Sequence, residues 1–311
     1  MLGGQAAATW WLSVPVLALL GLAIGSFLNV VVHRLPRMME RDWWADVAHA
    51  LGDGDSFRRT FDADAPRALG ASAADLNQRL EGLAPYGLAR PRSACPACGH
   101  AIRWFENIPV VSWVALRGRC SACRTPISPR YPLLELLTAA LFAAAGWRFG
   151  AQPVALLWCA VLAVLVALAA IDWDTTLLPD SLTLPLLWAG LVASALGWTG
   201  LPLIDALWGV LAGYLSLWSV YWLFKKATGK EGMGFGDFKL LAALGAWLGW
   251  QAILPIVLMA SVIGAAVGIA MKVSGSLREG RYVPFGPFLA GGGVVVVLAG
   301  TERVLGWIGQ R

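Results

Sequence analysis

Charged side chains are scarce in this chain of 311 residues. Asp, Glu, Lys and Arg together make up 14% of it, whereas soluble domains contain about 25%. Hydrophobic residues make up 58%, before the 35 glycines are counted. This composition excludes an ordinary soluble enzyme. The charges are also unevenly spread, because residues 33–131 hold 14 arginines and 10 acids. The sequence therefore predicts a membrane-embedded body with one polar insert.

Lysine and arginine are absent from the residues before the first apolar run, Trp10–Val32. This run contains 23 residues and no charge, which is enough to cross about 30 Å of hydrocarbon at about 1.5 Å per residue. A cleavable signal peptide begins with a positively charged segment, and none precedes this run. We therefore expect the first span to be retained.

Seven further apolar runs follow, so the predicted fold class is an all-α polytopic membrane protein with about eight transmembrane helices. These runs are Leu133–Trp147, Pro153–Ile171, Leu182–Trp198, Leu203–Phe224, Leu240–Trp250, Ile253–Met271 and Val283–Leu305. The first and fifth of them are short for a full crossing, so either could be tilted, longer than drawn or re-entrant.

Basic residues gather on one side of this predicted topology. The insert and the three loops on its side of the membrane, 172–181, 225–239 and 272–282, hold 21 of the 24 Lys and Arg residues, and the other side keeps Arg148, Arg303 and Arg311. By the positive-inside rule, the insert faces the cytoplasm and both termini lie outside. The net charge of +5 then reports orientation, and we expect membrane lipid but no nucleic acid as a partner.

Only five cysteines are present, and four of them form two CxxC pairs, Cys95 with Cys98 and Cys120 with Cys123. Two such pairs supply the four thiolates of a tetrahedral zinc site, which is structural because no coordination position stays open. Two disulfides or a redox CxxC are the alternatives, but a reducing cytoplasm and the lack of a thioredoxin-like pattern disfavour them. His100 could substitute as a ligand, although we interpret it as a loop residue. The remaining cysteine, in the third apolar run, is interpreted as a small hydrophobic residue.

Acids are rare in the membrane body, and most lie in the segments IDWDTTLLPD (171–180) and GMGFGDFKL (232–240). Asp172 directly follows an apolar run, and Asp237 follows three alternating glycines. The predicted topology places both on the cytoplasmic face. Two carboxylates held close together cannot both ionise, so one can act as the acid and the other as the base in peptide hydrolysis. Asp174 and Asp180 precede predicted helix starts and could be N-caps, an interpretation that we favour for Asp180. Lys239 either tunes Asp237 or extends to the interface.

Six ordered motifs resemble those of bacterial type IV prepilin peptidases, the prepilin leader peptidase/N-methyltransferase family of intramembrane aspartic proteases. They are GSFLNVVVHRLP from Gly25, the double CxxC, ENIPVVSW from Glu106 with LRGRC ending at Cys120, ISPRYPLLELLTA from Ile127, IDWDTTLLPD and GMGFGDFKL. The resemblance covers nearly the whole chain, omitting mainly residues 45–90. That stretch lacks a strong period or an aromatic core, and we expect a loosely ordered or short-helical insertion there.

The resemblance implies a bifunctional enzyme of the bacterial inner membrane. It implies cleavage of the basic leader of type IV prepilins and type II secretion pseudopilins at the cytoplasmic face, followed by N-methylation of the new terminus with S-adenosylmethionine. The family's catalytic aspartates correspond to Asp172 and Asp237, and its zinc ligands correspond to the four paired cysteines. The implied organisation is residues 1–32 as the first transmembrane helix, 33–131 as the cytoplasmic zinc insert and 132–311 as the peptidase domain. Methyl transfer rests on resemblance alone, because the chain lacks a soluble-type G-x-G-x-x-G element.

Two other classes of protein remain as alternatives. A proton- or ion-coupled transporter would place its acids near the middle of the bilayer and would contain an internal repeat, and no convincing repeat is present. A zinc-stabilised scaffold without catalysis would leave the glycine-rich segment before Asp237 unexplained.

Overall fold

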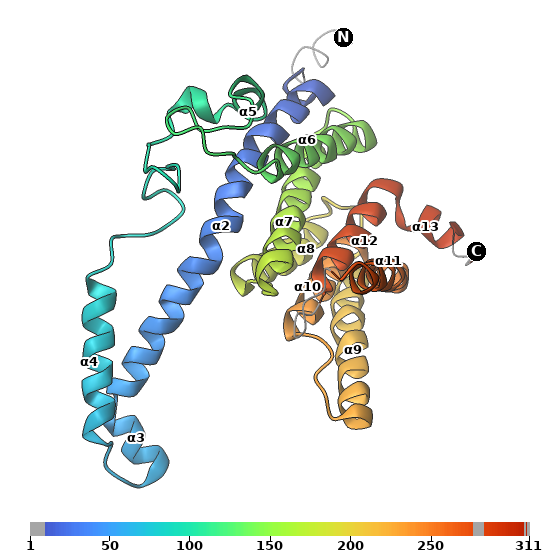
Figure 1. The fold of residues 1–311 in the computed structure, drawn as a ribbon. Helices are drawn as coiled ribbons and strands as arrows, with labels where there is room; N and C mark the ends of the chain where they lie inside the picture. The colour runs from blue at the N-terminus through green and yellow to red at the C-terminus, as the bar shows by residue number, and fades with distance from the viewer. Residues whose placement is uncertain (1–9, 276–282, 308, 310–311) are drawn as a thin grey trace.

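The computed structural model describes residues 10–275, 283–307 and 309, and this part of the chain is helical (Figure 1). Within it, β-structure is limited to two isolated bridges, Ala94 with Ala101 and Arg119 with Pro126. The predicted all-α fold is therefore confirmed. Arg278, Arg281 and Arg311, three of the basic residues used to predict orientation, lie outside the described residues. The helices are η1 Trp10–Leu12, α2 Val14–Gly52, α3 Gly54–Phe61, α4 Arg67–Glu81, η2 Trp104–Asn107, α5 Val111–Ala115, α6 Arg130–Phe149, α7 Pro153–Thr175, α8 Asp180–Ala195, α9 Leu203–Thr228, α10 Phe235–Leu248, η3 Trp250–Ala252, α11 Ile253–Val273, α12 Gly286–Ala299 and α13 Thr301–Trp307.

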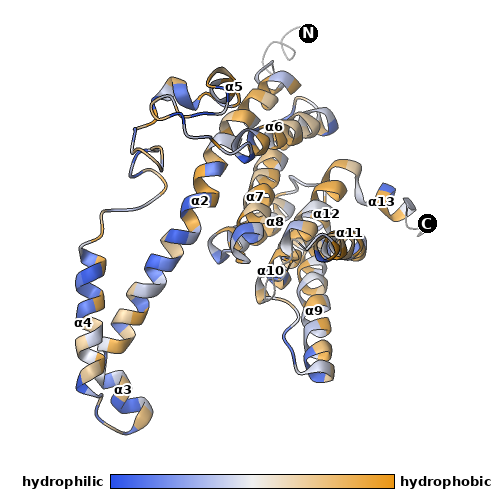
Figure 2. Ribbon diagram, in the orientation of Figure 1, coloured by the Kyte–Doolittle hydropathy of each residue, from blue (hydrophilic) through white to orange (hydrophobic). Residues whose placement is uncertain are grey.

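Helix α2 continues far beyond the apolar run that predicted it. The run ends at Val32, but the helix extends over 39 residues to Gly52 and contains Pro36. Its second half is polar and carries α3 and α4 at its far end, away from the apolar helices (Figures 1 and 2). Ala48 of α2 and Ala73 of α4 are buried where α4 packs along α2. The segment expected to be loosely ordered or short-helical is therefore short-helical and packed against α2.

Small residues bring α2 against α6. A Cβ atom at Gly21 would lie 2.6 Å from Cα of Ala139, and one at Gly25 would lie 2.7 Å from Cα of Glu135. Larger residues would push the two backbones apart, which explains why glycine occurs twice on this face of an apolar helix. The insert between the two helices is thus anchored at both ends by one helix pair.

The remaining helices form the apolar body around α7, α10 and α12. Helix α7 is buried along most of its length, α10 packs against α8 and α9, and α12 lies against α7, α10 and α11. Gly209 of α9 and Gly245 of α10 meet backbone to backbone. This close crossing holds α10 inside the bundle, where ten of its 14 residues are buried.

All eight predicted apolar runs fall on helices of the described structure. Five of these are long and apolar enough to cross a membrane: α2, α6, α7, α9 and η3 with α11. Helices α12 and α13 pass the same test only as a pair bent by 109°, which makes a sixth span if they count as one. Helices α8 and α10 have 16 and 14 residues, or about 24 Å and 21 Å of rise. Each is therefore shorter than the hydrocarbon core of about 30 Å.

Candidate active site and metal centre

Asp172 lies in the last turn of α7 and is buried, with 4% of its surface exposed. The backbone N–H of Gly286, the first residue of α12, donates to its Oδ2 atom at 3.0 Å. A Cβ atom at Gly286 would lie 2.5 Å from that oxygen. The start of α12 therefore reaches the carboxylate only because residue 286 is glycine.

Asp237 lies in the first turn of α10 and is buried as well, with 7% of its surface exposed. It interacts electrostatically with Asp172, so the structure brings the two predicted carboxylates together. Gly234, the last glycine of the alternating series before α10 starts, is the N-cap, and its carbonyl accepts the Asp237 N–H at 3.3 Å. The glycine-rich segment thus leads into α10 and places Asp237 in the first turn of that helix.

Leu178 packs between the two halves of this site. It lies on the link between α7 and α8, and Cβ atoms at Gly236 and Gly286 would lie 2.8 Å and 3.2 Å from its side chain. The link begins at Thr176, which adopts the left-handed conformation with φ of 56°. That conformation is unfavourable for a β-branched residue. The turn after Asp172 therefore stores strain beside the paired carboxylates.

Asp174 and Asp180 do not act as N-caps, so that interpretation is wrong for both. Asp174 lies inside the last turn of α7 and pairs with Arg130 at 2.7 Å. Asp180 is the first residue of α8, after the N-cap Pro179, and its side chain makes no cap hydrogen bond. Lys239 donates to both carboxylate oxygens of Asp180 at 2.7 Å. The two outer acids have basic partners, which separates them from the buried pair.

An open apolar groove of about 400 Å³ runs beside the acids, between α6, α7 and α12. Small residues line part of it, including Ala169, Ala170, Ala290 and Gly291. Its lining also includes Arg130, which pairs with Asp174, and Pro287, the neighbour of Gly286. The groove therefore lies alongside the helix ends that carry and contact Asp172.

The four paired cysteines form one cluster in the insert. Their sulfur atoms all lie within 4.8 Å of one another, and Sγ of Cys95 is 3.8 Å from Sγ of Cys123. Four sulfurs placed tetrahedrally about 2.3 Å from zinc are about 3.8 Å apart. The donor set and spacing therefore fit a zinc ion, and none of the four is bonded to another as a disulfide.

The two CxxC segments fold as equivalent knuckles. In each, the N–H of the first cysteine donates at 2.9 Å to the carbonyl five residues later, Cys95 to His100 and Cys120 to Thr125. The residue after each second cysteine has positive φ, 72° at Gly99 and 62° at Arg124. Hydrogen bonding to the side chain and backbone of Thr125 lowers the pKa of Cys123 to about 6, whereas the pKa of Cys98 is raised to about 11, because a hydrogen bond to the His100 backbone is outweighed by its hydrogen bonds to the other cysteines and by desolvation.

His100 lies beside the cluster but pairs with Glu106 across 3.1 Å. The N–H of Arg103 donates to the same Glu106 carboxylate at 2.9 Å, and this bond, more than the histidine, lowers the pKa of Glu106 to about 2. The described cluster of potential ligands contains the four cysteines and no histidine. The interpretation of His100 as a loop residue therefore fits the structure.

A buried acid on α6 holds the insert against the membrane body. Glu135 accepts the N–H of Val110 at 2.7 Å, and Ser26 of α2 hydrogen-bonds it as well. Val110 has φ of 59°, which is strained for a β-branched residue. Neither Glu135 nor Gly286 is among the residues predicted from the sequence. An acid within an apolar run is a signal for the first, but no local pattern tells which carboxylate a glycine at a helix start will face.

Comparison with known proteins finds two family models and a set of relatives. Residues 19–149 match the model of the bacterial peptidase A24 N-terminal domain, and residues 159–269 match the model of the type IV leader peptidase family. A protein of Burkholderia pseudomallei named prepilin leader peptidase/N-methyltransferase is 52% identical over 287 residues, covering 92% of this chain and 85% of its own.

Two further relatives carry the same name. The protein of Aeromonas hydrophila is 48% identical over 94% of this chain and 92% of its own, and that of Pseudomonas aeruginosa is 49% identical over 91% and 89%. No solved structure matches the chain significantly. These relatives favour an enzyme over the transporter and scaffold alternatives.

Proposed function

The chain belongs to the type IV leader peptidase family, and we propose that it removes the basic leaders of type IV prepilins and type II secretion pseudopilins with Asp172 and Asp237. The observation that carries this proposal is the burial of two interacting carboxylates at one end of the helical body. Buried acids in a membrane protein are costly unless they are used or paired. The other two acids of the same segments have basic partners, so the buried pair is the one available for chemistry.

The proposed reaction divides acid and base roles between the two aspartates. The ionised carboxylate takes a proton from water, whose oxygen attacks the scissile carbonyl, while the protonated carboxyl donates to the carbonyl oxygen. The tetrahedral intermediate then collapses: the peptide C–N bond breaks, the protonated carboxyl gives its proton to the leaving amine, and the ionised carboxylate takes a proton from a hydroxyl of the intermediate, which leaves the dyad with one proton again. The Gly286 N–H fixes Oδ2 of Asp172. Because the two groups titrate as a pair, the base and acid roles belong to the dyad.

The groove between α6, α7 and α12 is the proposed place of the substrate's apolar helix. A substrate anchored in the membrane has to approach sideways, and this groove is open, apolar and lined by small residues that allow close helix contact. Its position along α7 and the start of α12 brings an occupant to the end of the helix that carries Asp172.

We also propose that the cysteine cluster binds a structural zinc ion. Four thiolates would complete its coordination and leave no position for water or substrate, so the ion would cross-link the two knuckles. The proposed organisation keeps residues 1–32 as the first transmembrane helix, 33–131 as the insert and 132–311 as the peptidase domain. In this arrangement the protein lies in the bacterial inner membrane with the insert and the aspartates facing the cytoplasm.

The second proposed activity is methylation of the newly exposed N-terminal amine by S-adenosylmethionine. It is supported by the names of the relatives, which combine the peptidase with an N-methyltransferase. The free amine exists only after cleavage, so methyl transfer acts on the product of the peptidase reaction.

A two-readout assay tests the proposal. Purified full-length protein in liposomes is incubated with a prepilin and labelled S-adenosylmethionine, and mass spectrometry and label incorporation follow the two steps. Leader removal and methyl transfer by the unmodified protein are expected, whereas Asp172→Asn should block cleavage yet still methylate a substrate supplied without its leader. Intact prepilin after incubation with active, folded protein would refute the peptidase assignment.

A further inference from the structure

A charged pocket lies at the opposite end of the bundle from the aspartates. It is a cavity of about 710 Å³ between the end of α6 and the bend from α12 to α13, lined by Trp147, Arg148, Gly300 and Arg303 among others. Helix α6 begins at Arg130, beside Asp174, and reaches Arg148 18 residues later, roughly 27 Å along its axis. The pocket therefore lies at the other membrane face.

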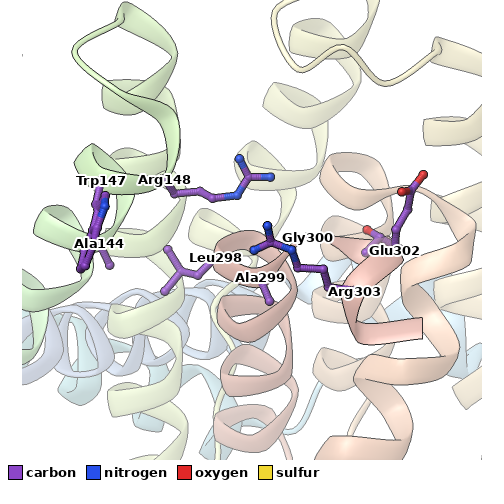
Figure 3. A pocket seen from close by; sticks show the side chains of 9 residues that line it. Ala144, Trp147, Arg148, Leu298, Ala299, Gly300, Glu302 and Arg303 are labelled. Atoms are coloured by element: carbon purple, nitrogen blue, oxygen red, sulfur yellow. The ribbon is translucent and has the colours of Figure 1, made fainter. Parts of the chain in front are cut away.

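Two guanidinium groups converge in this pocket. Figure 3 shows Arg148 from α6 and Arg303 from α13 extending toward one another across the gap, while Glu302 points away from both. Among the described residues, neither arginine makes an ion pair, and the Arg148 guanidinium lies over the face of Phe149 and near Gly300. Two like charges near a low-dielectric bundle repel each other. An anion between them would remove that repulsion.

Basic residues are rare on the membrane face that carries this pocket, so the convergence of two arginines there points to a ligand. The topology assigns three basic residues to it, Arg148, Arg303 and Arg311, and Arg311 lies outside the described residues. The two described arginines of a face that is otherwise poor in basic residues thus share one cavity. Chance spacing over the whole face would more often keep them apart.

The surroundings of the arginines match a lipid rather than a soluble anion. Trp147, next to Arg148, is 86% exposed, as expected of a tryptophan at the membrane interface. Ala144, Leu298 and Ala299 provide an apolar wall below the guanidinium groups (Figure 3). A phosphate held by two guanidinium forks, with acyl chains along the apolar wall, satisfies both parts of the pocket.

We propose that this pocket binds the phosphate head group of an anionic phospholipid, with Arg148 and Arg303 as its ligands. The site stands apart from the proposed peptidase chemistry, because its lining residues include neither aspartate nor cysteine. A bound lipid would bridge α6 to the α12–α13 bend, which has Gly300 with φ of 91° at its corner. It would therefore stabilise the junction between the two elements.

The test measures lipid retention by the full-length protein with native mass spectrometry. Phosphatidylglycerol, phosphatidylcholine and inorganic phosphate are titrated separately against the wild type, the Arg148→Gln/Arg303→Gln variant and an Arg59→Gln/Arg92→Gln control. The control removes the same charge from exposed positions of the insert. Each pocket arginine is expected to contribute about fivefold to phosphatidylglycerol affinity, so the double variant should bind at least tenfold more weakly while the control binds as the wild type does.

Three results would overturn the proposal. They are equal phosphatidylglycerol binding by the pocket variant and the wild type, equal binding of phosphatidylcholine, and displacement of the lipid by inorganic phosphate at similar concentration. The last result would mean a free-anion site. A thermal melt checks that each variant is folded, and Arg148→Lys/Arg303→Lys provides a charge-preserving variant that should retain most of the lipid binding. Loss of binding by the folded lysine variant, equal to the loss in the glutamine variant, would also contradict charge recognition.

Discussion

Asp172 and Asp237 lie at opposite kinds of helix end, of which only the N-terminal one stabilises a carboxylate. Asp237 is in the first turn of α10, where the helix dipole and free N–H groups favour negative charge, whereas Asp172 is in the last turn of α7. The start of α12 compensates for this, because its first N–H donates to Asp172. Each carboxylate thus lies at a helix N-terminus: Asp237 at that of its own helix, α10, and Asp172 at that of α12.

The Gly286 contact gives the first testable prediction. Gly286→Ala places a methyl group 2.5 Å from where Oδ2 of Asp172 now lies, so the carboxylate has to move. We expect leader cleavage to fall by about 10- to 100-fold, because small displacements of reacting groups are costly. The measurement is kcat for prepilin cleavage, with Gly306→Ala as the control, since a Cβ atom there meets nothing within 4 Å. Equal rates for the two variants would show that this contact does not position the acid.

At the residue scale, the sequence pointed to the two buried acids as candidates but not to their surroundings. Scarcity in an apolar chain singled out Asp172 and Asp237, and the structure brings them together. The partners of Asp174, Asp180 and Lys239 depend on which helix ends meet in three dimensions. Local position before a helix suggested caps, and long-range ion pairs occur instead.

At the scale of elements, the apolar runs coincide with helices of the described structure, but run length does not tell where each helix ends. Helix α2 extends 20 residues beyond the end of its apolar run, and α4 packs against part of this polar extension. Helices α8 and α10, with 16 and 14 residues, are short for a full crossing, and close glycine contacts, Gly190 of α8 with α10 and Gly209 of α9 with Gly245 of α10, pack them into the bundle. Such packing depends on which helices are neighbours, and single-run patterns do not contain that information.

The groove beside α7 provides an element-scale prediction. Gly291 lines the groove, and a Cβ atom there meets nothing within 4 Å, so Gly291→Leu fits the fold while filling the groove. We expect KM for membrane-anchored prepilin to rise severalfold with kcat little changed, because substrate binding and not chemistry is affected. Ala265→Leu, on an exposed part of α11, is the matched control.

Steady-state kinetics in liposomes separates the possible outcomes. A normal KM for Gly291→Leu, with the control also normal, would show that the substrate helix does not use this groove. The same variant should melt at the wild-type temperature if the substitution fits as the open space indicates.

The insert offers a metal prediction. We expect about one zinc per chain in the purified protein and nearly none after Cys98→Ser, because each of the four thiols supplies one ligand. Cys159→Ala should leave the zinc content unchanged, since Cys159 is buried in α7, away from the cluster. Elemental analysis gives the stoichiometry, and limited proteolysis of residues 93–127 should accelerate in Cys98→Ser. Full zinc content in that variant would place the metal elsewhere.

At the scale of the whole molecule, two faces of one helical body carry different chemistry. One face carries the cysteine insert and the acids, and the other carries the arginine pocket. The uneven distribution of basic residues predicts the first face as cytoplasmic. Charge counts along the sequence are enough to predict this division, whereas the convergence of Arg148 of α6 with Arg303 of α13, beside the 109° bend between α12 and α13, is visible only in three dimensions.

The central claim, that Asp172 and Asp237 act as one catalytic unit, is tested most directly by a mutant cycle. Prepilin cleavage is measured for the wild type, Asp172→Asn, Asp237→Asn and the double variant, with Asp205→Asn in the first turn of α9 as the control. Each single substitution should lower kcat by about 10³-fold or more, and the double variant should lose no more than either single one, because a dyad fails as a unit. Near-normal cleavage by either single variant, or losses that multiply in the double variant, would contradict the account.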